Sequence, residues 1–103
     1  MERISFVLKI DPNRVDEYIE RHSRVDPELE ELFKNIGIRH YRIFHHQGLL
    51  FALMEVENYD SAMSRLRDHP ANVKWQAFMA DMLVPWEDGQ TTKPIREVYR
   101  FDS

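Results

Sequence analysis

The chain has 103 residues, no cysteine and a formal net charge of -4 at pH 7. This length predicts one domain, residues 1–103, whose core needs neither disulfides nor metal. The lack of cysteine excludes disulfides and thiolate chemistry, and the interspersed charges disfavour nucleic acid or a membrane as a partner. With no apolar run as long as a signal peptide or membrane span, we expect a cytoplasmic protein.

The first 37 residues predict a strand and two helices. Apolar side chains alternate from Ile4 to Ile10 with a period of two, which is typical of a half-buried strand. Asp11-Pro12 and Asp26-Pro27 are each a helix start signal, because aspartate accepts hydrogen bonds from the free amides of a first turn and proline has no amide to leave unpaired. Gly37 can end the second helix.

The first of these helices carries the first candidate for chemistry. Tyr18 and His22 lie four residues apart and therefore on one face, in the last turn of the helix. A histidine side chain can give or take a proton near neutral pH, and the helix dipole at this end favours its charged form. The inward face of the helix is expected to consist of Val15, Tyr18, Ile19 and His22.

The middle of the chain predicts an antiparallel hairpin followed by two helices. Residues 38–46 and 49–56 favour strands and are joined by Gln47-Gly48, a tight-turn pair. Tyr41 lies on the first arm of this hairpin. Asn58 can cap a short helix, and a longer helix is expected from Pro70 to about Leu83, carrying Trp75 and Gln76.

The last part predicts a loop over residues 85–94 and a closing strand over residues 95–101. The element order is that of an α+β fold of the ferredoxin-like kind, an antiparallel sheet with helices on one face. The other face needs a cover, which can be a second copy of the chain or a bound ligand. Because Phe6 and Phe44 are expected on that face, we predict a two-fold homodimer forming a dimeric α+β barrel.

The residues taken alone leave several interpretations open. Five histidines are present, but none is spaced from another histidine or from a carboxylate in the way that metal ligands are. We therefore expect no metal. His22 can simply bond the last carbonyls of its helix, and Tyr41 and Trp75 can be ordinary core aromatics. Trp86, in the polar loop, is harder to place in a core and suggests a lid or an interface anchor.

The combination of motifs resembles the L-rhamnose mutarotase family along essentially the whole chain. The matching features are Asp11-Pro12, Glu17-Tyr18, Arg21-His22, Pro27-Glu28-Leu29, Gly37, Tyr41, Leu50-Phe51, Trp75, Met79, Asp81-Met82 and Glu97-Val98-Tyr99. The resemblance implies a dimeric α+β barrel without a cofactor that exchanges the α and β anomers of a 6-deoxy-L-sugar. It also implies that His22 is the proton donor and that Tyr18, Tyr41 and the tryptophan pair beginning at Trp75 contact the sugar.

Two positions depart from the family pattern. Gln76 stands where the family has the second tryptophan, and Asp26 stands where a tryptophan usually precedes Pro27. Pro85-Trp86 looks like a feature of L-fucose-type relatives. These departures concern the identity of the sugar more than the reaction, because the amide of Gln76 can bond a hydroxyl that a tryptophan cannot serve in the same way.

The sequence thus predicts a cofactor-independent aldose 1-epimerase for L-rhamnose or a related 6-deoxy-L-sugar such as L-fucose. His22 would act as acid and base, and Tyr18, Tyr41, Trp75 and Gln76 would bind the monosaccharide. Two alternatives belong to other classes. One is a dimeric α+β barrel that binds a small ligand without catalysis, and the other is a cofactor-free monooxygenase.

Overall fold

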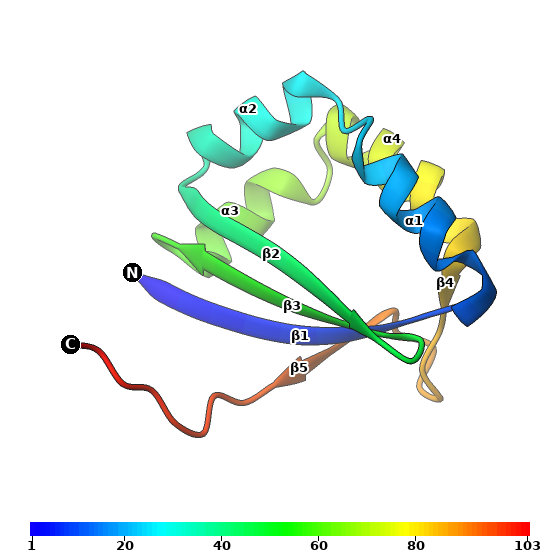
Figure 1. Cartoon of the computed structure of the whole chain (residues 1–103). Coiled ribbons are helices and arrows are strands. Elements are labelled where there is room, and N and C mark those ends of the chain that lie inside the picture. Colours follow the sequence, from blue (N-terminus) through cyan, green and yellow to red (C-terminus); the bar gives the residue numbers. More distant parts are fainter.

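The structure, a computed structural model, describes all residues 1–103. It consists of an antiparallel five-stranded sheet with four α-helices on one face (Figure 1). Two short 3-10 helices, Pro12–Arg14 and Ala80–Met82, precede α1 and follow α4. The elements are β1 Glu2–Ile10, α1 Val15–His22, α2 Pro27–Asn35, β2 Ile38–His46, β3 Leu49–Val56, α3 Tyr59–Leu66, α4 Pro70–Met79, β4 Leu83–Val84 and β5 Thr92–Ile95.

Strand β1 lies at the centre of the sheet. The strand order is β2-β3-β1-β4, and β5 also pairs with β1. The edge of β1 that faces away from β3 is shared, because Lys9 and Ile10 pair with β4 whereas Ser5 to Leu8 pair with β5. The fold class predicted from the sequence, α+β with helices on one face of an antiparallel sheet, is confirmed.

The helix ends form where local chemistry predicts them. Asp26 accepts a hydrogen bond from the amide of Glu28, and Asn58 accepts one from the amide of Ser61, so each caps the helix that follows. Gly37 ends the segment after α2 with φ of 93°, a left-handed conformation that side chains other than glycine rarely adopt. Asp26 and Asn58 thus mark where α2 and α3 begin, and Gly37 marks where the chain turns back into the sheet as β2.

Three predicted boundaries were wrong. The first helix is divided into a 3-10 turn and α1, and α4 ends at Met79 instead of continuing to Leu83. Leu83 pairs with Ile10 as part of β4, so pairing with β1 prevails over the helical apolar pattern. The closing strand is Thr92–Ile95 and not residues 95–101. Its Pro94 is tolerated because β5 lies at the edge of the sheet.

The two faces of the sheet differ in what covers them. On the helical side, one core cluster consists of Ile10, Tyr18, Leu50, Met79 and Met82, and a second of Ile36, Ile38, Met54, Val56 and Ala62. Phe6, expected on the opposite face, lies on this side instead, with its ring 6.2 Å from that of Tyr41. Phe6 is two residues from both Ile4 and Leu8, so its side chain lies on the same face of β1 as theirs. The prediction that placed Phe6 on the opposite face was therefore wrong.

The face away from the helices carries an exposed apolar group that we call the outer patch. It consists of Phe44, Phe51, Leu53 and Ile95, of which Phe44 is 57% exposed. Strand pairing places these residues in two adjacent rows, since Phe51 is opposite Phe44 and Val7, while Leu53 and Ile95 are both opposite Ser5. The prediction that Phe44 lies on this face agrees with this register.

An ion-pair cluster joins α1 to the 3-10 helix after α4. Arg14 and Arg21 both donate to the carboxylates of Glu17 and Asp81. The hydrogen bonds from Arg14 and Arg21 lower the pKa of Glu17 to about 2, and those from Arg21 and Arg14 hold the pKa of Asp81 well below its usual range. The cluster thereby holds α1 against the end of α4, where the cavity described below is formed.

We expect Glu17→Gln to lower the thermal unfolding midpoint at pH 7 more than at about pH 2. A carboxylate whose pKa is lower in the folded chain stabilises it above the unfolded value of about 4.3, and that stabilisation is lost as the pH falls to the folded value. The effect is small, because Glu17 is partly exposed to solvent and salt screens the cluster. An equal loss at both pH values, or an equal loss in Glu31→Gln, would contradict this assignment.

No helix of the structure is both long enough and apolar enough to cross a membrane.

Candidate active site

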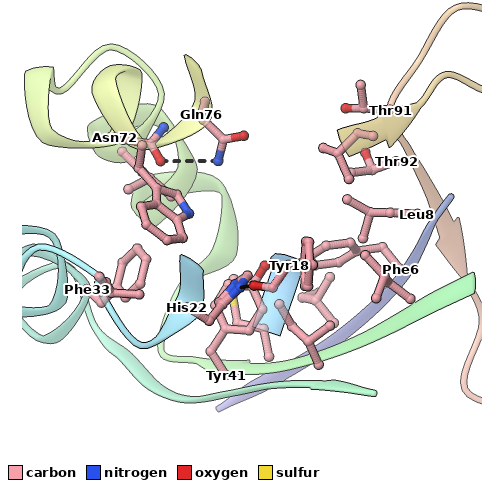
Figure 2. A pocket seen from close by; sticks show the side chains of 18 of the residues that line it. Phe6, Leu8, Tyr18, His22, Phe33, Tyr41, Asn72, Gln76, Thr91 and Thr92 are labelled. Atoms are coloured by element: carbon pink, nitrogen blue, oxygen red, sulfur yellow. Dashed lines mark hydrogen bonds between the residues drawn. The ribbon is translucent and has the colours of Figure 1, made fainter. Parts of the chain in front are cut away.

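A cavity of about 880 Å³ lies between the helices and the helical side of the sheet. Its wall is mostly hydrophobic, and all five strands contribute to it together with all four helices. The five residues predicted to form a site all line this one cavity: Tyr18, His22, Tyr41, Trp75 and Gln76. Figure 2 shows Tyr18, His22, Tyr41 and Gln76 around the same space.

His22 is held at the end of α1 by a hydrogen bond to its own helix. Its Nδ1 donates to the backbone oxygen of Tyr18 over 3.0 Å. A carbonyl oxygen only accepts, so Nδ1 must carry the hydrogen, and Nε2 is the nitrogen left to exchange a proton with a ligand. The ordinary interpretation, in which the imidazole bonds a helix carbonyl, is thus correct for Nδ1 and leaves Nε2 available in the cavity.

One phenol stands beside this imidazole, and a second lies among the aromatic rings of the cavity wall. The ring of Tyr18 lies 4.5 Å from that of His22, and Tyr41 lies between Phe6 and Phe33, 6.2 and 6.1 Å away. Desolvation raises the pKa of Tyr18 to about 12. Desolvation, with smaller contributions from Tyr18 and Tyr59, also raises the pKa of Tyr41. Both phenols therefore stay protonated near neutral pH and suit hydrogen bonding better than proton removal.

Trp75 connects the imidazole to helix α4. Its ring meets that of His22 nearly at right angles, 5.4 Å away, and it packs against Phe78 at 5.7 Å. An aromatic ring on a cavity wall offers an apolar surface to a ligand. The next residue, Gln76, donates from Nε2 to Oδ1 of Asn72 over 3.5 Å. The two residues thus place an aromatic surface and an amide side by side.

Several cavity residues were not found by sequence reasoning. They include Phe6, Phe33, Asn72, Thr91 and Thr92. The signal for Asn72 was its place four residues before Gln76 on one helix face. No local signal indicated Thr91 and Thr92, because they reach the cavity only through the pairing of β5 with β1. Ile19, predicted to face inward, lies at the rim of the cavity and is 61% exposed.

Trp86 lies outside the residues that line this cavity. Its ring is covered by Lys9, whose Nζ is 4.5 Å from the ring centroid, and its Nε1 is buried without a partner. Its backbone closes the turn toward β5, since Trp86 N donates to the oxygen of Gln90 over 2.8 Å. The role of Trp86 as a lid or interface anchor stays a prediction.

The structure has no group of three or more His, Cys, Asp or Glu side chains placed to hold a metal ion. His45, one of the five histidines, instead accepts a hydrogen bond at Nε2 from the amide of Gly48 over 3.0 Å, at the hairpin turn.

Comparison with known proteins identifies the relatives of this chain. A family model described as L-rhamnose mutarotase matches residues 3–101. The chain belongs to the L-rhamnose mutarotase family. A curated L-rhamnose mutarotase from Sinorhizobium fredii is 35% identical over 105 residues, covering 98% of this chain and 99% of the relative.

Solved structures place the fold in the same group. The crystal structure of an L-rhamnose mutarotase from Formosa agariphila superposes with a TM-score of 0.84 at 30% identity, covering 99% of this chain and 100% of that one. A tetracenomycin F2 cyclase from Streptomyces glaucescens has a TM-score of 0.63 at 22% identity, covering 100% and 99%, which shows a shared fold only. Membership of the mutarotase family disfavours the binding-module and monooxygenase alternatives.

Proposed function

We propose that this member of the L-rhamnose mutarotase family exchanges the α and β anomers of L-rhamnose or a related 6-deoxy-L-sugar such as L-fucose. The observation that carries the proposal is the position of His22, whose Nδ1 is bound to the Tyr18 carbonyl while its ring lines the cavity. Family membership supports the reaction class. The reaction needs proton transfers alone, so these side chains can supply its chemistry without a cofactor.

The proposed reaction opens and closes the sugar ring. A proton reaches the ring oxygen and another leaves the anomeric hydroxyl, the bond between the anomeric carbon and the ring oxygen breaks, and the open aldehyde forms. After the aldehyde carbon has turned, the ring oxygen attacks its other face and the two transfers reverse. His22 Nε2 can act in either direction, as the donor when the imidazole is charged and as the acceptor when it is neutral.

The remaining residues have binding roles in this proposal. Tyr18 and Tyr41, kept neutral by their raised pKa values, hold sugar hydroxyls. Trp75 lies against the apolar side of the deoxy sugar, and Gln76 bonds one of its hydroxyls. We further propose that a single domain of residues 1–103 carries the activity and that it acts in the cytoplasm, in rhamnose or related carbohydrate metabolism.

The proposal is tested by exchange NMR on a panel of aldoses. We expect the protein to increase magnetisation transfer between the α and β anomeric signals of at least one 6-deoxy-L-sugar. A panel without any accelerated sugar, measured with folded protein, would refute the mutarotase assignment for this chain.

We also propose that the chain is a two-fold homodimer whose copies meet at the outer patch. Four apolar side chains in adjacent rows are difficult to leave in water, and a second copy of the same patch would cover them. Sedimentation at micromolar concentration should give a dimer, and Leu53→Lys should shift it toward monomer. Val73→Lys, which changes an exposed apolar residue of α4, serves as the matched control. A monomeric wild type would overturn this proposal.

A further inference from the structure

Two amide side chains of the cavity wall lie near Trp75 on the same helix. Asn72 and Gln76 both lie on α4 and both line the cavity. Asn72 is 8% exposed, which makes it a buried amide within a mostly hydrophobic wall. Its side chain makes one hydrogen bond within the chain, the 3.5 Å contact with Gln76. Because one hydrogen bond does not use all the donors and acceptors of two amides, this pair leaves hydrogen-bonding capacity for a ligand.

The pairing itself restricts what the two amides can offer. An amide pair bonds through one nitrogen and one oxygen, here Gln76 Nε2 and Asn72 Oδ1. The groups left over are Gln76 Oε1 and Asn72 Nδ2. If both amides were turned over together, the leftover groups would again be one nitrogen and one oxygen. In either orientation at least one whole amide nitrogen and one whole amide oxygen stay free, so the pair can both donate to and accept from a hydroxyl group or two neighbouring hydroxyls.

The side chains around the Asn72–Gln76 pair indicate which part of a bound sugar the pair would contact. In Figure 2 the Gln76 amide oxygen points away from Asn72, toward the part of the cavity where Thr91 and Thr92 lie. Trp75 adjoins Gln76 in the chain and contacts His22 with its ring. A sugar lying on Trp75 with its anomeric end at His22 therefore meets the Asn72–Gln76 pair along another edge of its ring.

We propose that Asn72 is a positioning residue that, with Gln76, forms one unit for recognising hydroxyls of the substrate away from the anomeric carbon. Asn72 holds the Gln76 amide in place, and the pair accepts and donates a hydrogen bond to one hydroxyl or to two adjacent ones. The substrate class is thus a 6-deoxy aldose whose hydroxyls meet this pair. The choice of substrate in this inference rests on the proposed mutarotase function. Its test measures sugar binding separately from anomer exchange.

The test is a double-mutant cycle with Asn72→Leu, Gln76→Leu and both together. Leucine resembles both side chains in size and removes every hydrogen bond. Dissociation constants are measured by NMR titration for the sugar that the wild type binds best and for its monodeoxy analogues, next to exchange rates and thermal midpoints. The wild type should bind one analogue roughly tenfold more weakly than the parent sugar. All three variants should lose that discrimination to the same extent, because the two amides act as a unit.

A purely structural role for Asn72 would change the thermal midpoint and leave discrimination between the parent sugar and the analogue intact. Lys74→Leu, on the same helix but outside the cavity, is the control and should keep the discrimination. If the wild type accelerates exchange but Asn72→Leu discriminates as well as the wild type, the inference is overturned while the mutarotase function stands. If binding follows the expected pattern but no sugar is exchanged, the function fails and the recognition unit stands. Absence of any sugar binding would overturn both.

Discussion

His22→Ala is expected to lower the exchange rate by about 10²- to 10⁴-fold, the usual contribution of a positioned general acid or base. Nε2 is the nitrogen that His22 leaves available in the cavity, because Nδ1 is bound to the Tyr18 carbonyl. Neither phenol of the cavity wall is a good substitute, since the pKa of Tyr18 is raised to about 12 and that of Tyr41 is raised as well. Exchange NMR of the preferred sugar measures the loss directly.

The fold should survive this change, because truncation of a residue at a helix end removes little packing. His46→Ala is the matched control, since His46 is exposed on β2 and does not line the cavity. It should exchange anomers like the wild type. A His22→Ala variant that remains folded and exchanges at the wild-type rate would remove His22 from the mechanism, and so would an equal loss in His46→Ala.

The parts of the fold that the sequence predicts are those encoded by local chemistry. The hairpin is an example, since Gln47 and Gly48 both adopt positive φ, 49° and 82°, as a two-residue turn requires. The caps at Asp26 and Asn58 are likewise read from single residues. What could not be read locally is which strand pairs with which. The partner of Leu83 is Ile10 of β1, a contact that the helical apolar pattern around Leu83 does not reveal.

The end of the chain illustrates the same limit. Residues 95–101 favour a strand by composition, but the edge of β1 receives Thr92 to Ile95 and ends there. Beyond it, Glu97 and Arg100 pair with each other, while Val98, Tyr99 and Phe101 remain exposed. Strand-forming residues without a partner strand do not make a strand, which is why propensity alone misplaced the element.

The candidate site was predictable in part. The pairing of Tyr18 with His22 was predicted from helical spacing. The prediction that Tyr41 and Trp75 line the same cavity depended on resemblance to a family, since these residues come from three separate elements. Asn72 has a helical relation to Gln76, yet nothing in the sequence shows that it is buried beside a cavity. Burial is a property of the packed chain, and it is what turns an ordinary helix pair into a candidate recognition unit.

Gln76→Trp is expected to shift preference toward L-rhamnose by about 1 to 3 kcal/mol, the size expected when a polar group that the bound sugar covers gains or loses its partner. Gln76 lines the cavity next to Trp75, and its amide can bond a hydroxyl that L-rhamnose places differently from the preferred sugar, for which L-fucose is the leading candidate. A site built to bond a hydroxyl discriminates more sharply than an apolar wall does. Tryptophan at this position would give the chain the tryptophan pair that its sequence resemblance implies for the family.

The quantity that decides this prediction is the ratio of exchange efficiencies for L-fucose and L-rhamnose, measured with the wild type and with Gln76→Trp. A ratio compares two sugars on the same protein, so partial unfolding or a general loss of activity cancels from it. Gln90→Trp introduces the same ring in the exposed turn before β5, outside the cavity, and should leave the ratio unchanged. If Gln76→Trp also leaves it unchanged, Gln76 does not face the part of the sugar in which L-fucose and L-rhamnose differ, and their discrimination must come from other residues of the cavity wall.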